Sequence, residues 1–87
     1  MKEQTGEKHI TSFYLAAYLF TKGQNLRAID FDDPRRADFV FEGSKDIDDL
    51  VQQFNFASPQ EQSVLVDARE FIMSIKMLKD KLYQGRA

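Results

Sequence analysis

The sequence has no cysteine and a single histidine, His9, among its 87 residues. Without thiols the chain cannot form a disulfide, a thiolate metal site or a cysteine nucleophile. One histidine cannot supply a His-pair metal site or a histidine-based catalytic relay within one subunit. We therefore expect a small domain held together by packing alone, with His9 partly exposed at the edge of the fold.

Glycines and long apolar runs are also scarce. The four glycines are isolated from one another, so the chain has no glycine-rich loop that could bind phosphate. The longest apolar run, residues 13–20, is far shorter than the ~20 residues that cross a bilayer. The N-terminus is polar where a signal peptide would be apolar. These features predict a cytoplasmic protein with no membrane partner.

The residues that are present are those of one ordinary globular domain, with 43% hydrophobic and 30% charged residues. Eight phenylalanines and three tyrosines predict a core built on aromatic rings. The net charge of -2 argues against a general nucleic-acid coat, although it leaves room for a local basic patch.

Residues 13–20 read FYLAAYLF and predict a helix. Thr11 or Ser12 can cap its start, and Gly23 can end it in a left-handed conformation. No solvent-facing side can be drawn, because every position of the run is apolar or aromatic. We expect this to be the central helix around which the domain packs.

Residues 26–42 predict a β-hairpin. Apolar residues recur at a period of two on both sides of a turn at residues 32–36, as in Phe39 and Phe41. The turn contains aspartates, which bond the backbone locally, and a proline, which presets a turn dihedral angle. The phenylalanine-bearing face of the hairpin should lie on the helices.

Two further helices are expected. Residues 44–54 carry apolar residues at helical spacing on one side, with Ser44 as the cap. The last helix has two candidate starts, one at Ser58 followed by proline and a later one at Asp67. We favour the later start, with residues 63–66 extended as a short third strand beside the hairpin.

The resulting order, α-β-β-α-(β)-α, is that of an α+β domain. A single-layer hairpin, with or without the short third strand, packs on three helices. We expect residues 1–10 to form a flexible N-terminal segment, residues 11–84 the domain and residues 85–87 a C-terminal tail.

These patterns resemble a family of small bacterial and phage-borne domains of unknown function. The resemblance covers roughly residues 11–84. It is carried by the YLAA segment at residues 14–17, the FVF strand at residues 39–41 and the Leu78-Lys79 pair. These are mostly core positions, so the resemblance implies the fold and no particular chemistry.

The acidic residues do not predict a metal or catalytic site. Asp30, Asp32 and Asp33 could supply oxygen ligands, but Pro34 and Arg35 stand where a calcium-binding EF-hand loop needs a ligand and a glycine. We interpret these aspartates as a solvated turn. Other carboxylates fall in helix starts, loops and charged faces, where we expect solvent to keep their acid–base behaviour that of ordinary surface carboxylates. We expect no cofactor, no metal and no enzymatic activity.

Basic residues suggest one alternative function. Arg35 and Arg36 at the hairpin tip, with Arg27 and Lys22, could bind phosphates of a nucleic acid, as in an accessory protein of a mobile element. The neighbouring aspartates cancel much of that positive field.

The leading hypothesis is a protein-interaction module that self-associates or docks on a host protein. Tyr14 and Tyr18 lie one helical turn apart, and so do Met73 and Met77, on a flank away from the main apolar stripe of the last helix. Tyrosine and methionine are favoured at protein interfaces, because they make large and adaptable contacts. The other interpretation is that they cover the rim of a small core.

Overall fold

The computed structural model describes residues 6–32, 36–58 and 62–86. Within them the elements follow in the order β1 (Glu7–Ile10), α1 (Phe13–Thr21), β2 (Leu26–Asp30), β3 (Asp38–Glu42), α2 (Lys45–Phe56), the 3-10 turn η1 (Gln62–Val64) and α3 (Ala68–Arg86). This is an α+β domain with three α-helices and one antiparallel sheet of three strands in the described ranges, so the predicted fold class is confirmed.

The sheet has the order β1-β3-β2, with β3 in the centre. The hairpin of β2 and β3 is confirmed, although residues 33–35 of its turn lie outside the described residues. The third strand is β1, which pairs with β3 so that Ile10 stands opposite Phe39.

Two predictions are therefore wrong, one about the N-terminal segment of residues 1–10 and one about the position of the third strand. Residues 7–10 belong to the sheet and are not part of a flexible segment. The expected strand at residues 63–66 does not form. Gln62–Val64 make a 3-10 turn instead, and Val64 and Val66 are half-buried against the core. These valines gain burial by packing and need no strand partner to do so.

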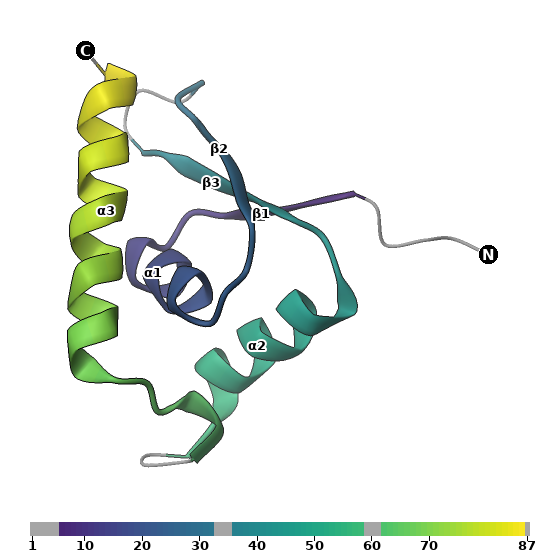
Figure 1. Cartoon of the computed structure of the whole chain (residues 1–87). Coiled ribbons are helices and arrows are strands. Elements are labelled where there is room, and N and C mark those ends of the chain that lie inside the picture. Colours follow the sequence, from purple (N-terminus) through teal and green to yellow (C-terminus); the bar gives the residue numbers. More distant parts are fainter. Residues whose placement is uncertain (1–5, 33–35, 59–61, 87) are drawn as a thin grey trace.

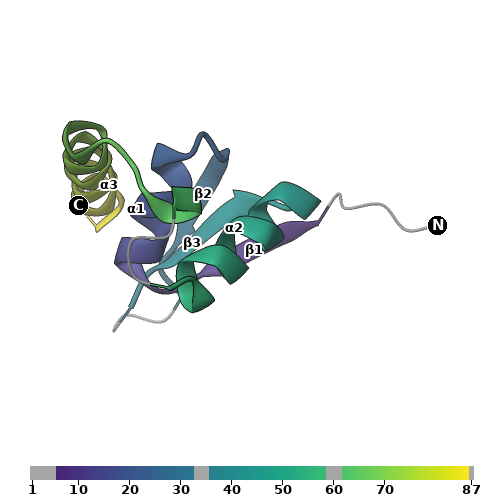
Figure 2. The same cartoon turned by 90° about the horizontal axis from the view of Figure 1, so that it is seen from below.

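The helices surround α1 (Figures 1 and 2). Both views show α1 between the sheet and α3, while α3 runs along one outer side of the molecule. α2 follows the sheet at the end where β3 leaves it, and an ion pair of 3.0 Å from Lys8 Nζ to Asp48 Oδ1 ties β1 to α2. α3 continues to Arg86, so residues 85 and 86 belong to a helix and the predicted tail does not begin at residue 85.

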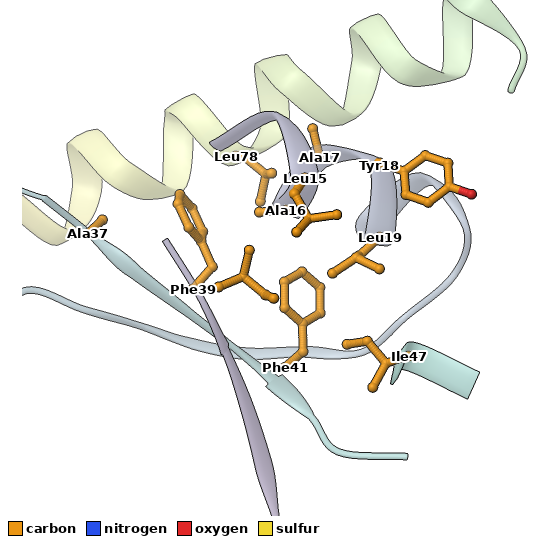
Figure 3. Packing of buried hydrophobic residues seen from close by; sticks show 11 residues of the cluster. Leu15, Ala16, Ala17, Tyr18, Leu19, Ala37, Phe39, Phe41, Ile47 and Leu78 are labelled. Carbon is orange, nitrogen blue, oxygen red and sulfur yellow. The ribbon is translucent and has the colours of Figure 1, made fainter. Parts of the chain in front are cut away.

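The core forms where α1 meets the central strand (Figure 3). All five residues from Leu15 to Leu19 are buried, and Ala16 and Ala17 are small enough to let neighbouring elements approach closely. Phe39 and Phe41 point from β3 toward this helix. Ile47 from α2 and Leu78 from α3 complete the cluster. The prediction of a central first helix is confirmed. Each large apolar side chain buried in this way stabilises the fold by about 1.5–3 kcal/mol.

Local signals set the helix ends as expected. The hydroxyls of Ser12 and Ser44 accept hydrogen bonds from backbone N–H groups in the first turns of α1 and α2. Gly23 adopts φ 89° after α1, a conformation that glycine tolerates best. Asp67 Oδ1 accepts from the N–H groups of Arg69 and Glu70, at 2.8 and 3.1 Å. The later start of the last helix is therefore confirmed.

Candidate functional site

Most of the surface of α3 faces away from the core. Although the helix has 19 residues, only Ser74 and Leu78 among those described are buried, and the inward side is completed by half-buried apolar residues. On the outward side, Ile72, Met73 and Met77 are 50%, 58% and 45% exposed. Helical spacing alone would place Ile72 beside Phe71 and Ile75 in the apolar stripe of this helix, but its side chain is half exposed. Methionine exposure on this helix agrees with the predicted position of Met73 and Met77 on an open flank.

Charged residues stand between these apolar side chains. At 3.6 residues per turn, Lys76 and Asp80 lie on one side of the helix, with Ile72 to one side of them and Met73 and Met77 to the other. Both charged residues are exposed, and neither makes an ion pair among the described residues. We call the surface of Ile72, Met73, Lys76, Met77 and Asp80 the α3 face.

The predicted surface of two tyrosines does not exist, because the structure separates Tyr14 from Tyr18. Tyr14 is 62% exposed, whereas Tyr18 is 2% exposed. The ring of Phe54 from α2 lies 5.0 Å from the ring of Tyr18, and Lys22 Nζ lies 5.7 Å from that ring. Burial raises the pKa of the Tyr18 phenol above its ordinary value. Tyr18 therefore belongs to the core and cannot contact a partner.

The predicted basic cluster is dispersed. Lys22 lies just before β2 and Arg36 lies beyond its other end, and a strand of five residues spans roughly 17 Å. Arg27 on β2 is near Glu42, with 3.7 Å between its Nη2 and a carboxylate oxygen. Arg35 lies outside the described residues. The described basic residues thus do not form one phosphate-binding surface.

Acidic residues line a small cavity of about 140 Å³ at the base of the hairpin turn, together with Thr11 and Arg36. Asp30 Oδ1 accepts a hydrogen bond of 2.9 Å from the N–H of Asp32, which is the local backbone bond expected of a turn aspartate. The negative charge of Asp30 raises the pKa of Asp32. No cluster of three or more histidine, cysteine or acidic side chains in the described ranges is arranged to hold a metal ion.

His9 bridges two carboxylates on the face of the sheet opposite α1. Its Nδ1 lies 2.7 Å from Asp38 Oδ2, and its Nε2 lies 3.3 Å from Glu7 Oε1. The hydrogen bond with Asp38 is the main cause that raises the pKa of His9 above its ordinary value of 6.5. This contact links β1 to β3, because Glu7 and His9 belong to one strand and Asp38 to the other.

A groove follows the outer edge of β2, where sequence reasoning expected no site. It has a volume of about 230 Å³ and lies between residues 26–29 of the strand, the ring of Phe31 and the last turns of α3. Its ionisable lining residues are Arg27 and Lys81, both basic. No sequence signal could have paired them, because they lie on different elements and only the packing of α3 beside β2 brings them together.

None of the helices in the described part of the chain combines the length and the apolar character that a membrane span requires. Comparisons with curated proteins and with solved structures give no match. Residues 6–84, however, match a family model. The match spans every strand and α-helix given above except the last residues of α3, and it agrees with the resemblance inferred from the core positions. The chain therefore belongs to the family described as a domain of unknown function, DUF5659.

Proposed function

We propose that this protein is a non-enzymatic protein-interaction module that self-associates through the α3 face. The observation that carries the proposal is the exposure of Ile72, Met73 and Met77 on α3, the helix that runs along the outside of the molecule (Figure 1). Large exposed apolar side chains gathered on one surface are typical of interaction sites. Methionine suits such a surface because its flexible thioether adapts to a partner.

The charges of the α3 face favour a second copy of the chain as the partner. In a two-fold symmetric dimer every contact occurs twice: if one residue contacts a second residue of the partner, that second residue also contacts the first residue of the partner. Two antiparallel α3 helices would place Lys76 of each chain beside Asp80 of the other. The apolar residues on both sides of this pair would then be covered together, so the surface is complementary to itself in charge and in polarity.

Sedimentation equilibrium over a range of protein concentrations tests the proposal. The unmodified chain should form a dimer, and the Met73→Glu/Met77→Glu variant should be a monomer with an unchanged circular dichroism spectrum. The control is Phe56→Glu, which places one negative charge at an exposed aromatic position on α2. A chain that stays monomeric at every concentration would contradict self-association and leave docking on another protein as the form of the module.

Charge exchange distinguishes the α3 face from other dimer surfaces. Asp80→Lys alone should weaken the dimer, because the introduced lysine then faces Lys76 of the other copy. Adding Lys76→Asp should restore the attraction with reversed polarity and recover much of the affinity. If the double variant is no stronger than Asp80→Lys, the two helices do not pair in this way.

The nucleic-acid alternative stays a prediction and no observation favours it, since the basic residues in the described ranges are dispersed. If the protein is retained on immobilised nucleic acid, and if this retention decreases steeply as the salt concentration rises, the nucleic-acid alternative would be supported. The cytoplasmic location and the bacterial or phage origin also remain predictions from the sequence.

A further inference from the structure

The sheet has two edge strands, β1 and β2, and the edge of β2 is the one that borders the groove. In the described part of the chain, β2 pairs with β3 alone, whereas β3 has a partner on each side. An edge strand presents backbone N–H and C=O groups of alternate residues to whatever lies beside it. Such an edge can accept an extended peptide as an additional strand.

The open edge of β2 is the floor of the groove. The cavity of about 230 Å³ follows residues 26–29 and is closed on the other side by the C-terminal turns of α3. Gly85 packs against the ring of Phe31 at this end of the helix, and a side chain at Gly85 would collide with that ring. An incoming strand would therefore lie along the edge of β2, with the apolar surface of Phe31 and Ile29 beside it.

The charge of the groove indicates what could occupy it. Among the described residues its lining contains the basic residues Arg27 and Lys81 and no acidic one, although the chain as a whole carries a net charge of -2. Arg27 makes an ion pair with Glu42, with 3.7 Å between its Nη2 and a carboxylate oxygen, whereas Lys81 makes no ion pair within the described residues. The groove thus carries positive charge on an acidic protein, with Arg27 partly neutralised by Glu42 and Lys81 uncompensated.

We propose that the groove between β2 and α3 binds an extended acidic segment of another protein, which adds as a strand to the edge of β2. Backbone hydrogen bonds hold the segment, Arg27 and Lys81 select its acidic side chains, and an apolar side chain packs on Phe31. This proposal does not depend on the α3 face, and a failure of either proposal would leave the other unaffected.

A second copy of the chain fits the groove poorly. Two copies that joined along β2 would bring the arginine and lysine of each groove close to those of the other, and like charges repel across an interface. A nucleic acid would meet the positive charges, but it has no backbone that continues the hydrogen-bond ladder of a sheet. An acidic peptide strand uses both features of the groove.

A displayed library of short peptides with alternating acidic and apolar positions, and a matched lysine-bearing library, provide the probes. Acidic peptides should be enriched on the full-length chain. The selected peptide should shift the backbone amide resonances of residues 26–29 and bind the Lys81→Glu variant about tenfold more weakly, as expected for one close charge pair. The control Lys45→Glu makes the same charge change at an exposed position on α2 and should leave binding unchanged.

N-methylation of alternate residues of the selected peptide tests strand addition directly. It keeps the charge and the side chains but removes backbone donors, so binding should be lost with methyl groups at one set of alternate positions. Equal binding of both N-methylated forms would overturn the proposal. It is equally overturned if no acidic peptide is enriched over the lysine peptides, or if a single-stranded oligonucleotide displaces the peptide and shifts the same amides.

Discussion

The two helices with the longest apolar patterns, α1 and α3, are buried to very different extents. α1 has nine residues and buries five in succession, from Leu15 to Leu19. α3 has 19 residues, and the described ones that are buried are Ser74 and Leu78. A helix between a sheet and another helix is covered on most sides, whereas a helix at the outside is covered along one stripe. We conclude that α1 supplies stability and that α3 presents surface.

The largest expected effect is at the centre of α1. Leu19→Ala should lower the free energy of unfolding by about 2–5 kcal/mol, because it leaves a cavity in a packed core. Ile72→Ala on the outward side of α3 should change it by less than about 0.5 kcal/mol. Urea denaturation measured by circular dichroism gives both values. Comparable losses at the two positions would mean that the outward side of α3 is packed as tightly as the core.

A smaller effect is expected where the end of α3 meets β2. Gly85→Ala should destabilise the fold by about 1–3 kcal/mol, because the new methyl group overlaps the ring of Phe31. In a Phe31→Ala background the same change should instead stabilise the helix by up to about 1 kcal/mol, since alanine is the better helix former. Denaturation of the four chains measures this reversal of sign, and a stabilising Gly85→Ala in the unmodified chain would contradict it.

A part-buried hydrogen bond between side chains of α1 and α3 should contribute about 1 kcal/mol. The hydroxyl oxygens of Thr21 and Ser74 lie 2.8 Å apart, and Thr21 also donates to the carbonyl oxygen of Ala17 at 2.7 Å. Ser74→Ala removes the contact between helices and leaves the bond within α1. A double-mutant cycle with Thr21→Val measures the coupling, and a coupling near zero would show that apolar packing alone holds α3 on α1.

The smallest effect concerns the attachment of β1 and depends on pH. The pKa of His9 is raised in the folded chain, chiefly by its hydrogen bond with Asp38, so folding favours the protonated ring. This stabilisation is fully present below the ordinary pKa of 6.5 and is lost as the pH rises through the folded value. The unfolding free energy of the unmodified chain should therefore exceed that of His9→Gln more at about pH 5.5 than at about pH 8.5. A difference that is constant with pH would show that His9 carries no charge in this contact.

Local patterns predicted the elements that depend on near neighbours in the sequence. The alternation around Phe39 and Phe41 gave the hairpin, and the caps at Ser12 and Ser44 gave the helix starts. β1 was missed because only Ile10 of its four residues is apolar, so the sequence shows no apolar alternation there. Its strand conformation depends on pairing with β3, which is distant in the sequence.

The candidate sites were harder to predict than the elements. The spacing of Tyr14 and Tyr18 is that of one helix face, yet Phe54 of α2 covers one ring and leaves the other exposed. Spacing within a helix determines which side chains are neighbours, but it does not determine which of them another element of the fold covers. Met73 and Met77 are exposed, as the sequence predicted, because α3 runs along the outside of the described structure and is covered along one stripe.

The sequence by itself determined most of the core, the hairpin and the starts of the helices, because caps, turns and periodicity act over a few residues. Only the tertiary structure decided that β1 completes the sheet, that Tyr18 is buried and that Arg27 and Lys81 share a groove. These three outcomes depend on contacts between residues that lie on different elements, and a contact of that kind forms only when the whole chain has packed.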